Sequence, residues 1–322
     1  MSVLVFTESE DGKFKKIAFE AVSYGKAIAD MLDTTVTAIA INSSNTNELG
    51  KYGASKVLQV TDNKLENFNA QAYANVVSQA ASNEEAQVII ITSSANGKYM
   101  APFVAVNSQA GYVANATDVP ESVSPFKIRS TVYSNKAFAI TEISTDTKVI
   151  GLAKNAYGLK ENEVSITSED FTPNFSENDF NTEVVSVNKA TDKVTIADAD
   201  IVVSGGRGLK GPENWGMLEE LATVLGAATA CSKPVSDMGW RPHGEHVGQT
   251  GKPVSSNLYI AIGISGAIQH LAGVNSSKVK VVINNDPEAP FFKAADYGIV
   301  GDAFDLVPQL TEKIKEFKAQ NA

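Results

Sequence analysis

Three glycines and an arginine form the stretch of this chain best suited to bind an anion. Residues 201–211 are Ile-Val-Val-Ser-Gly-Gly-Arg-Gly-Leu-Lys-Gly, a β-branched run followed by a glycine loop. Gly206, Gly208 and Gly211 have the spacing G-x-G-x-x-G, in which missing side chains let backbone N–H groups approach a phosphate at a helix N-terminus. Arg207 adds a guanidinium that can form two parallel charge-assisted hydrogen bonds. The loop suits a nucleotide-like anion, although a strand-to-helix turn can also carry such glycines for steric reasons alone.

An ordinary NAD-binding unit would carry an acidic residue about 20 positions after its glycine loop, where it holds the ribose. Here residues 228–233 are Ala-Thr-Ala-Cys-Ser-Lys, and the next acid is Asp237. Plain NAD is therefore disfavoured.

Further polar and glycine clusters follow in the same half of the chain. They lie at residues 232–237, 247–251, 263–270 and 284–287. Because the carboxyl ends of parallel strands meet at one edge of a sheet, we expect these clusters to converge. The 247–251 cluster offers a hydroxyl, a carboxamide and backbone donors for a heteroaromatic ring, and the 263–270 cluster opens a helix whose free N–H groups can meet negative charge. The set favours a dinucleotide with a polar ring.

The histidines and the single cysteine are residue types that can bind a metal or take part in catalysis. His243 and His246 lie three residues apart, but Cys231 is the only thiol, so incidental histidines in a loop are favoured over a zinc site and no metal is predicted. Cys231 itself is predicted to be a buried small hydrophobe. His270 could donate to negative charge developing on a bound ring. No nucleophile–base pair stands out, so no hydrolase mechanism is supported.

The elements that position these residues follow from hydrophobic periodicity. Over residues 3–110, apolar β-branched runs alternate with segments of helical period, which predicts a parallel sheet covered by helices. The predicted strands are residues 3–6, 36–41, 56–60 and 88–92, and the predicted helices are residues 17–31, 70–81 and 98–110. Residues 93–97 follow a strand and could contact a nucleotide, but a structural turn is favoured because no phosphate loop with Lys and Ser/Thr is present there.

The pattern then changes between residues 128 and 187. Short runs at 131–133, 137–140 and 148–150 are separated by turn residues, which predicts antiparallel strands. Residues 169–182 are polar and predict an exposed connection. We place a domain boundary near residue 196.

Alternation of strands and helices resumes after that boundary. The predicted strands are residues 201–203, 257–263, 279–284 and 298–300, and the predicted helices are residues 213–225, 265–272 and 304–318. The predicted fold is therefore α/β with two domains. Residues 1–196 form a parallel sheet with helices plus antiparallel strands, and residues 197–322 form a smaller, doubly wound parallel sheet.

Composition narrows the class of protein. The 322 residues carry a formal net charge of −10, which argues against nucleic acid as a partner because a phosphate-backbone surface needs clustered Lys and Arg. One cysteine excludes an intrachain disulfide and favours a reducing compartment. The N-terminus runs almost directly into a predicted strand, with no apolar or Arg-rich leader, so we expect a complete cytoplasmic protein without membrane insertion.

Four ordered blocks carry a resemblance to a known family. They begin at Ser204 (SGGRGLK), Val247 (VGQTG), Gly263 (GISGAIQHLAG) and Asn285 (NDPEAP). Together they resemble the signature blocks of the electron transfer flavoprotein alpha subunit, over about 120 residues. The N-terminal part is similar only in its layout of strands and helices, which resembles a nucleotide-hydrolase-like domain, predicted here to hold no nucleotide of its own.

The resemblance implies a heterodimer with a beta subunit, with FAD held mainly by the C-terminal domain. It also implies a carrier that accepts electrons from acyl-CoA dehydrogenases and related flavin dehydrogenases, as in fatty acid beta-oxidation, and passes them to a quinone oxidoreductase or another acceptor. Thr250 would lie near flavin N5 and His270 near the pyrimidine oxygen. The positions implied to bind FAD are Arg207, Ser232, Lys233, Val247, Gly248, Gln249, Thr250, Ser265, Gly266, Ala267, Ile268, Gln269, His270, Asn284, Asp302 and Ala303.

Two positions depart from the family pattern. The family usually has an arginine over the flavin where this chain has Lys233, and a larger aliphatic residue where it has Ala303. Lysine keeps the charge but lacks the planar face, so flavin binding should survive while redox tuning changes. Electron transfer without a substrate of its own is the leading hypothesis, and no catalytic residue is predicted. An NAD-dependent oxidoreductase and a non-redox nucleotide-binding module are the alternatives.

Overall fold

The structure is a computed structural model that describes residues 2–133, 135–187, 195–196 and 199–321. The chain divides into two compact units, one formed by Met1–Val132 with Ala137–Val187 and the other by Tyr133–Lys136 with Asn188–Ala322. The domain boundary expected near residue 196 falls beside residues 197–198, which lie outside the described part of the chain. It stays a prediction.

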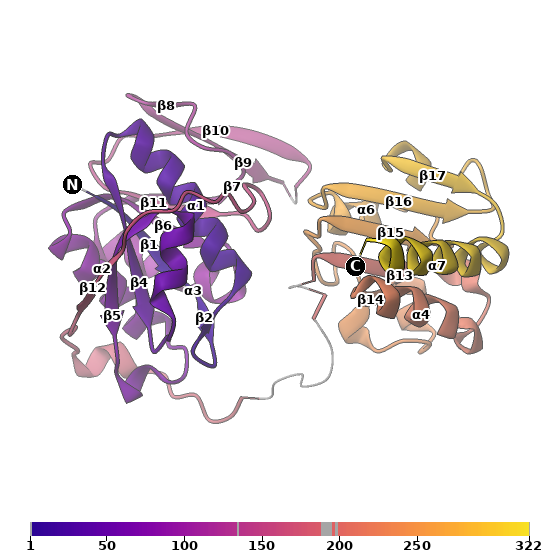
Figure 1. Ribbon diagram of the computed structural model, residues 1–322, viewed down its shortest axis with the longest axis horizontal. Helices are drawn as coiled ribbons and strands as arrows, with labels where there is room; N and C mark the ends of the chain where they lie inside the picture. Colours follow the sequence, from indigo (N-terminus) through magenta and orange to yellow (C-terminus); the bar gives the residue numbers. More distant parts are fainter. Residues whose placement is uncertain (1, 134, 188–194, 197–198, 322) are drawn as a thin grey trace. The chain divides into compact units, whose positions relative to one another are not determined.

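The first unit is built on one large mixed sheet (Figure 1). Its strands are β1 (Ser2–Thr7), β4 (Thr35–Ile41), β5 (Ala54–Val60), β6 (Ala86–Thr92), β7 (Gly111–Ala116), β8 (Ser122–Val123), β9 (Phe126–Val132), β10 (Ala137–Ile143), β11 (Lys148–Leu152) and β12 (Thr167–Asp170). The order is β10-β9-β7-β11-β6-β1-β4-β5-β12, with β8 paired to β9. All pairs are parallel except those that involve β9. A separate small ribbon joins β2 (Ser9–Glu10) to β3 (Lys13–Phe14).

Helices cover both faces of this sheet because its central strands are apolar on both sides. On β1, Val3 and Val5 belong to the core under α1 (Lys16–Met31), whereas Leu4 and Phe6 belong to the core under α2 (Ala70–Asn83) and α3 (Ala95–Asn107). A near-continuous apolar strand is typical of a parallel sheet buried on both faces. The predicted β-α alternation is confirmed.

One strand direction was predicted wrongly. Residues 148–150 were expected to be antiparallel, but β11 pairs parallel with both β6 and β7 in the middle of the sheet. The reason is burial: Val149 and Ile150 are fully buried in opposite cores, as a central parallel strand requires. The strand β7 was not predicted. The hairpin of β9 and β10 is antiparallel as expected.

The second unit contains a purely parallel sheet in the order β14-β13-β15-β16-β17 (Figure 1). Its strands are β13 (Ile201–Gly205), β14 (Ala228–Cys231), β15 (Leu258–Ile262), β16 (Val279–Asn284) and β17 (Tyr297–Val300). Helices α4 (Gly216–Leu225) and α7 (Ala303–Gln320) share one core, and α6 (Ile268–Val274) shares the other. The sheet is doubly wound, as predicted. The strand β14 and the short helix α5 (Lys233–Asp237) were not among the expected elements.

Short 3-10 helices connect the main elements. They are η1 (Thr46–Tyr52), η2 (Asn63–Leu65), η3 (Glu177–Phe180), η4 (Arg207–Leu209), η5 (Pro212–Asn214), η6 (His243–Glu245) and η7 (Pro290–Lys293).

Candidate functional site

A cavity of about 750 Å³ lies at the carboxyl edge of the second sheet. Its wall comes from the segments that follow β13, β14, β15 and β16, together with residues 246–250. The predicted site residues that line it are Arg207, Ser232, Lys233, Val247, Gly248, Gln249, Thr250, Ser265, Ala267, Gln269, His270 and Asn284. The polar clusters therefore converge, as expected from the parallel topology.

The glycine loop plays a different part from the one predicted. Gly206 N–H donates to the Ile262 carbonyl (2.8 Å) and Gly208 N–H to the Gly263 carbonyl (3.1 Å). A Cβ at position 206 would lie 2.1 Å from the Gly263 oxygen, and one at position 208 would lie 2.7 Å from Gly263 Cα. These glycines let the loop after β13 pack on the end of β15. The N–H groups of Gly206 and Gly208 are therefore already paired within the protein, and the following helix α4 begins only at Gly216.

The cationic side chains of the cavity come from two neighbouring loops. Arg207 is exposed and lines the wall after β13. Lys233 opens α5, where its ammonium lies 2.8 Å from a carboxylate oxygen of Asp237, which also lines the cavity. Asp237 was not predicted as a site residue. Its position four residues after Lys233 was the available signal.

Backbone hydrogen bonds hold the 247–251 segment in place. Val247 N–H donates to the Cys231 carbonyl (3.0 Å), and Gln249 N–H donates to the Gln269 carbonyl (2.7 Å). Val247 is buried, whereas Gln249 and Thr250 are exposed. The two polar side chains are thus presented from a backbone tied to both β14 and α6.

The loop between β15 and α6 alternates buried and exposed residues. Ile264 and Gly266 are buried, and Ser265 and Ala267 are exposed. Gly266 has φ +86°, and a Cβ there would lie 2.5 Å from the Phe291 nitrogen, so its role is close packing. This alternation places the small polar residues of the loop on the cavity side.

His270 is buried at the base of the site. Its Nε2 is 2.9 Å from the hydroxyl of Tyr259, and its Nδ1 has no hydrogen-bond partner among the described residues. Burial lowers the pKa of His270 to about 4, helped by nearby His246, while the Val247 carbonyl favours the protonated ring without reaching hydrogen-bond geometry. Burial also lowers the pKa of His246, whose Nδ1 is likewise unpartnered in the described chain. Both rings are neutral near pH 7.

Four predicted site residues do not line the cavity. Gly266 packs on Phe291, and Ile268 is 70% exposed. Asp302 caps α7 by accepting from Phe304 N–H (2.9 Å), and Ala303 is buried in the core that contains α7. Eight lining residues were not among the positions implied to bind FAD: Gly208, Pro234, Asp237, Met238, His246, Gly263, Ile264 and Asp286. All of these except Met238 and His246 lie in the glycine loop or in the clusters predicted to converge.

Comparison with known proteins identifies the family. Residues 195–275 match the electron transfer flavoprotein FAD-binding domain, and residues 3–171 match the electron transfer flavoprotein domain. The chain is 40% identical over 319 residues to electron transfer flavoprotein subunit alpha of Bacillus subtilis (strain 168), covering 98% of this chain and 97% of that protein. The chain belongs to the electron transfer flavoprotein alpha-subunit family. It is also 35% identical over 327 residues to the protein of the same name from Thermoanaerobacterium thermosaccharolyticum, covering 98% of each.

A further relative of this flavoprotein chain has a more specific name. It is the acryloyl-CoA reductase electron transfer subunit beta of Anaerotignum propionicum, 31% identical over 352 residues, with 98% of this chain and 96% of that protein covered.

FAD is the cofactor of this flavoprotein domain. The cavity fits such a ligand in volume, since ligand pockets typically measure about 300–1,000 Å³. It also fits in chemistry, because exposed hydroxyl, carboxamide and guanidinium groups converge there and two buried imidazoles each keep an unpartnered nitrogen. Buried polar atoms are normally hydrogen-bonded, so an unpartnered nitrogen on a residue that lines a cavity is available to a ligand.

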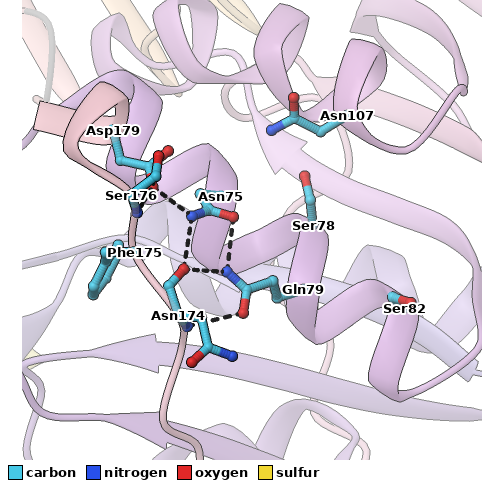
Figure 2. Close-up of a pocket in the computed structure, with 9 residues that line it drawn as sticks. All are labelled: Asn75, Ser78, Gln79, Ser82, Asn107, Asn174, Phe175, Ser176 and Asp179. Atoms are coloured by element: carbon cyan, nitrogen blue, oxygen red, sulfur yellow. Dashed lines mark hydrogen bonds between the residues drawn. The ribbon is translucent and has the colours of Figure 1, made fainter. Parts of the chain in front are cut away.

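A second hollow of about 570 Å³ in the first unit has a structural explanation (Figure 2). The Asn75 amide donates to the Asn174 carbonyl and to Asp179 (both 2.9 Å), and Gln79 exchanges hydrogen bonds with the Asn174 backbone (2.7 and 2.9 Å). These side chains bind the 174–179 segment to α2. The polar atoms of the Asn75 and Gln79 side chains are therefore already hydrogen-bonded within the protein.

The polar groups of residues 93–97 form hydrogen bonds within the protein. The Ser94 hydroxyl donates to Glu8 and accepts from Gly97 N–H (2.9 Å), and the Ser93 hydroxyl accepts from Asn115 N–H (3.2 Å). A Cβ at Gly97 would lie 1.9 Å from the Thr92 carbonyl oxygen. These contacts favour the structural interpretation of the loop.

The described residues include neither a membrane-spanning helix nor a cluster of metal ligands. No helix there is long and apolar enough to cross a membrane. Among the same residues, no group of three or more His, Cys, Asp or Glu side chains could hold a metal ion. Cys231 is buried, as predicted, and burial raises the pKa of its thiol to about 12.

Proposed function

We propose that this chain is the FAD-carrying alpha subunit of a two-subunit electron carrier. It accepts electrons from flavin dehydrogenases of the acyl-CoA type and passes them to a quinone oxidoreductase or another acceptor. The observation that carries the proposal is the cavity at the carboxyl edge of the second sheet, most of whose lining residues lie in the part of the chain that matches the FAD-binding domain.

The roles of the residues follow from their chemistry. FAD, when bound, supplies the electron transfer, so the protein contributes binding, orientation and electrostatics. Arg207 offers a charge-assisted donor for the anionic part of the cofactor, and Gln249 and Thr250 offer neutral hydrogen bonds. The wall is completed by Lys233, Ser265, Ala267, Gln269 and His270. No residue is assigned to acid–base catalysis, in keeping with a carrier that has no substrate of its own.

A redox partner that acts on coenzyme A esters is supported by one relative, whose name describes an electron transfer subunit of an acryloyl-CoA reductase. The partner in the complex is a beta subunit of the same flavoprotein. A role in fatty acid beta-oxidation is the metabolic setting that this donor class implies.

An absorption spectrum of the purified protein tests the proposal. We expect the chain co-expressed with a beta subunit to be yellow, to release FAD on denaturation, and to be reduced by an acyl-CoA dehydrogenase with its substrate. A colourless protein that binds NAD, or one that binds ATP or AMP, would replace the proposal with a dehydrogenase or a nucleotide-binding module.

The Arg207→Ala variant tests the site within that complex. Loss of a charge-assisted hydrogen bond should weaken FAD binding by about 1.5–3 kcal/mol, measured by calorimetry. The control is Lys278→Ala, which removes an exposed charge just before β16, outside the residues that line the cavity. Equal affinity in both variants would remove Arg207 from the site.

A further inference from the structure

Tyr259 contacts the site although it does not itself line the cavity. Tyr259 lies on β15 and is fully buried, and its ring stacks parallel to Phe291 with 6.4 Å between ring centroids. Its hydroxyl is 2.9 Å from Nε2 of His270, which lines the cavity and is 7% exposed. A rigid core side chain is therefore bonded directly to a residue of the site.

The direction of this hydrogen bond follows from the donors available. A neutral imidazole and a hydroxyl can each donate or accept, so both directions are possible in principle. Among the hydrogen bonds of normal geometry in the described chain, His270 Nε2 is the partner of the Tyr259 hydroxyl. If Nε2–H donated to the tyrosine, the phenolic O–H would have to turn to the Ser204 hydroxyl, which lacks hydrogen-bond geometry in the described chain, and it would lose its best acceptor. Tyr259 is therefore the donor and Nε2 the acceptor.

The surroundings of the pair agree with this direction. The Ser204 hydroxyl acts to lower the pKa of Tyr259, as a group directed at the phenol oxygen does, and its own oxygen has no hydrogen bond of normal geometry in the described chain. The Val247 carbonyl favours a protonated His270. Because Nε2 is occupied as an acceptor, a neutral ring carries its proton on Nδ1. That nitrogen is buried and has no partner in the described chain.

We propose that Tyr259 is a positioning residue: its hydroxyl donates to His270 Nε2 and holds the imidazole in the Nδ1-protonated tautomer, so that Nδ1–H can donate to the flavin acceptor that the family resemblance places near this histidine. The first two parts concern the protein alone. The last part rests on the proposed function.

The tautomer can be measured without any assay of electron transfer. The full chain has only three histidines, so ¹⁵N-labelled imidazoles can be assigned by comparison with His270→Gln. At neutral pH we expect a proton on Nδ1 and an unprotonated Nε2 in His270. In Tyr259→Phe the population should shift toward Nε2–H, while Tyr297→Phe, which alters a 67% exposed tyrosine on β17, should change nothing.

A wild-type spectrum with the proton on Nε2 would overturn the proposal, and so would an unchanged tautomer in Tyr259→Phe. If Tyr259→Phe does not fold, the wild-type spectrum alone decides.

Flavin binding provides the second readout. Tyr259→Phe should bind FAD about two- to tenfold more weakly, the worth of one neutral hydrogen bond, and Tyr297→Phe should bind it normally. A changed tautomer with unchanged FAD affinity would overturn the flavin contact and leave the tautomer assignment standing. If the wild-type complex binds no FAD, the proposed function fails, whereas the tautomer of His270 is still decided by its spectrum.

Discussion

Two loops of this protein occupy the same place in a parallel sheet and differ in what their polar groups do. Residues 93–97 follow β6 in the first unit and lead into α3, and residues 263–267 follow β15 in the second unit and lead into α6. Both strands are central in their sheets. Their position at the carboxyl end of a parallel strand would by itself predict a ligand site at both loops.

The two loops differ in whether their polar groups are hydrogen-bonded within the protein. In the first loop the Ser93 and Ser94 hydroxyls and the Gly97 N–H are all paired within the protein. In the second, Ser265 is exposed on the cavity wall, and His270, at the start of α6, keeps an unpartnered nitrogen. A strand-end loop is therefore a binding site only where its polar groups remain available.

Gly97→Ala is the strongest test of whether residues 93–97 are closely packed and paired within the protein. The new Cβ would meet the Thr92 carbonyl oxygen at 1.9 Å, so the backbone must move, and we expect a loss of about 3 kcal/mol in the free energy of unfolding. Gly216→Ala is the matched control, because nothing lies within 4 Å of its Cβ and it begins a helix. Urea unfolding measures both. A Gly97→Ala protein as stable as the control would mean that residues 93–97 are not closely packed against the Thr92 carbonyl.

Acid should weaken the second unit through His270. Its pKa is about 4 in the folded chain against about 6.5 when unfolded, so the unfolded state binds more protons between these values. The stabilisation is complete above pH 6.5 and is lost as pH falls toward 4, by about 3 kcal/mol in total and about 2 kcal/mol by pH 5. His246, whose pKa is also lowered, acts in the same direction.

All three histidines lie after residue 242. The part of the pH dependence of the unfolding free energy that they cause therefore reports on the second unit. Unfolding measured from pH 7 to 5 should show a clearly smaller slope in His270→Gln than in wild type. His243→Gln, which changes an exposed residue, should keep the wild-type slope. Identical slopes in all three proteins would mean that His270 is solvated.

A pair of serine substitutions sharpens the contrast further. Ser94→Ala removes the N-cap of α3 and should destabilise the protein by about 1 kcal/mol. Ser265→Ala changes an exposed side chain, so stability should stay within about 0.5 kcal/mol while FAD affinity falls. The two effects are measured by thermal unfolding and FAD titration. If Ser265→Ala were the destabilising variant, the assignment of the two loops would be reversed.

The smallest effect is expected at Lys233. Its ammonium is paired with Asp237 and its side chain is 56% exposed, so its influence on a bound flavin should be below about 1 kcal/mol. Lys233→Ala should lower the first reduction potential slightly, and Asp237→Asn should raise it, because a nearby positive charge favours electron uptake. Potentiometric titration of the FAD complex measures both. Equal potentials in wild type and both variants would show that this ion pair does not act on the flavin.

Much of the architecture could be predicted from local pattern. Apolar runs and helical periods located β1, β4, β5 and β6, as well as α1, because each of these elements is long and strongly periodic. The direction of β11 could not be predicted in this way. Val149 and Ile150 point into different cores, and only the assembled sheet supplies both neighbours.

Residue pattern alone was enough to predict the two α/β units, the convergence of polar clusters at one sheet edge, and the blocks that mark the flavoprotein family. How individual groups are used became visible only in the folded chain. Gly206 and Gly208 serve close packing against Gly263, and Tyr259, 11 residues before His270, reaches its ring nitrogen. The physical reason is that pattern encodes which side of an element is apolar, whereas the availability of a donor depends on neighbours that the fold brings together.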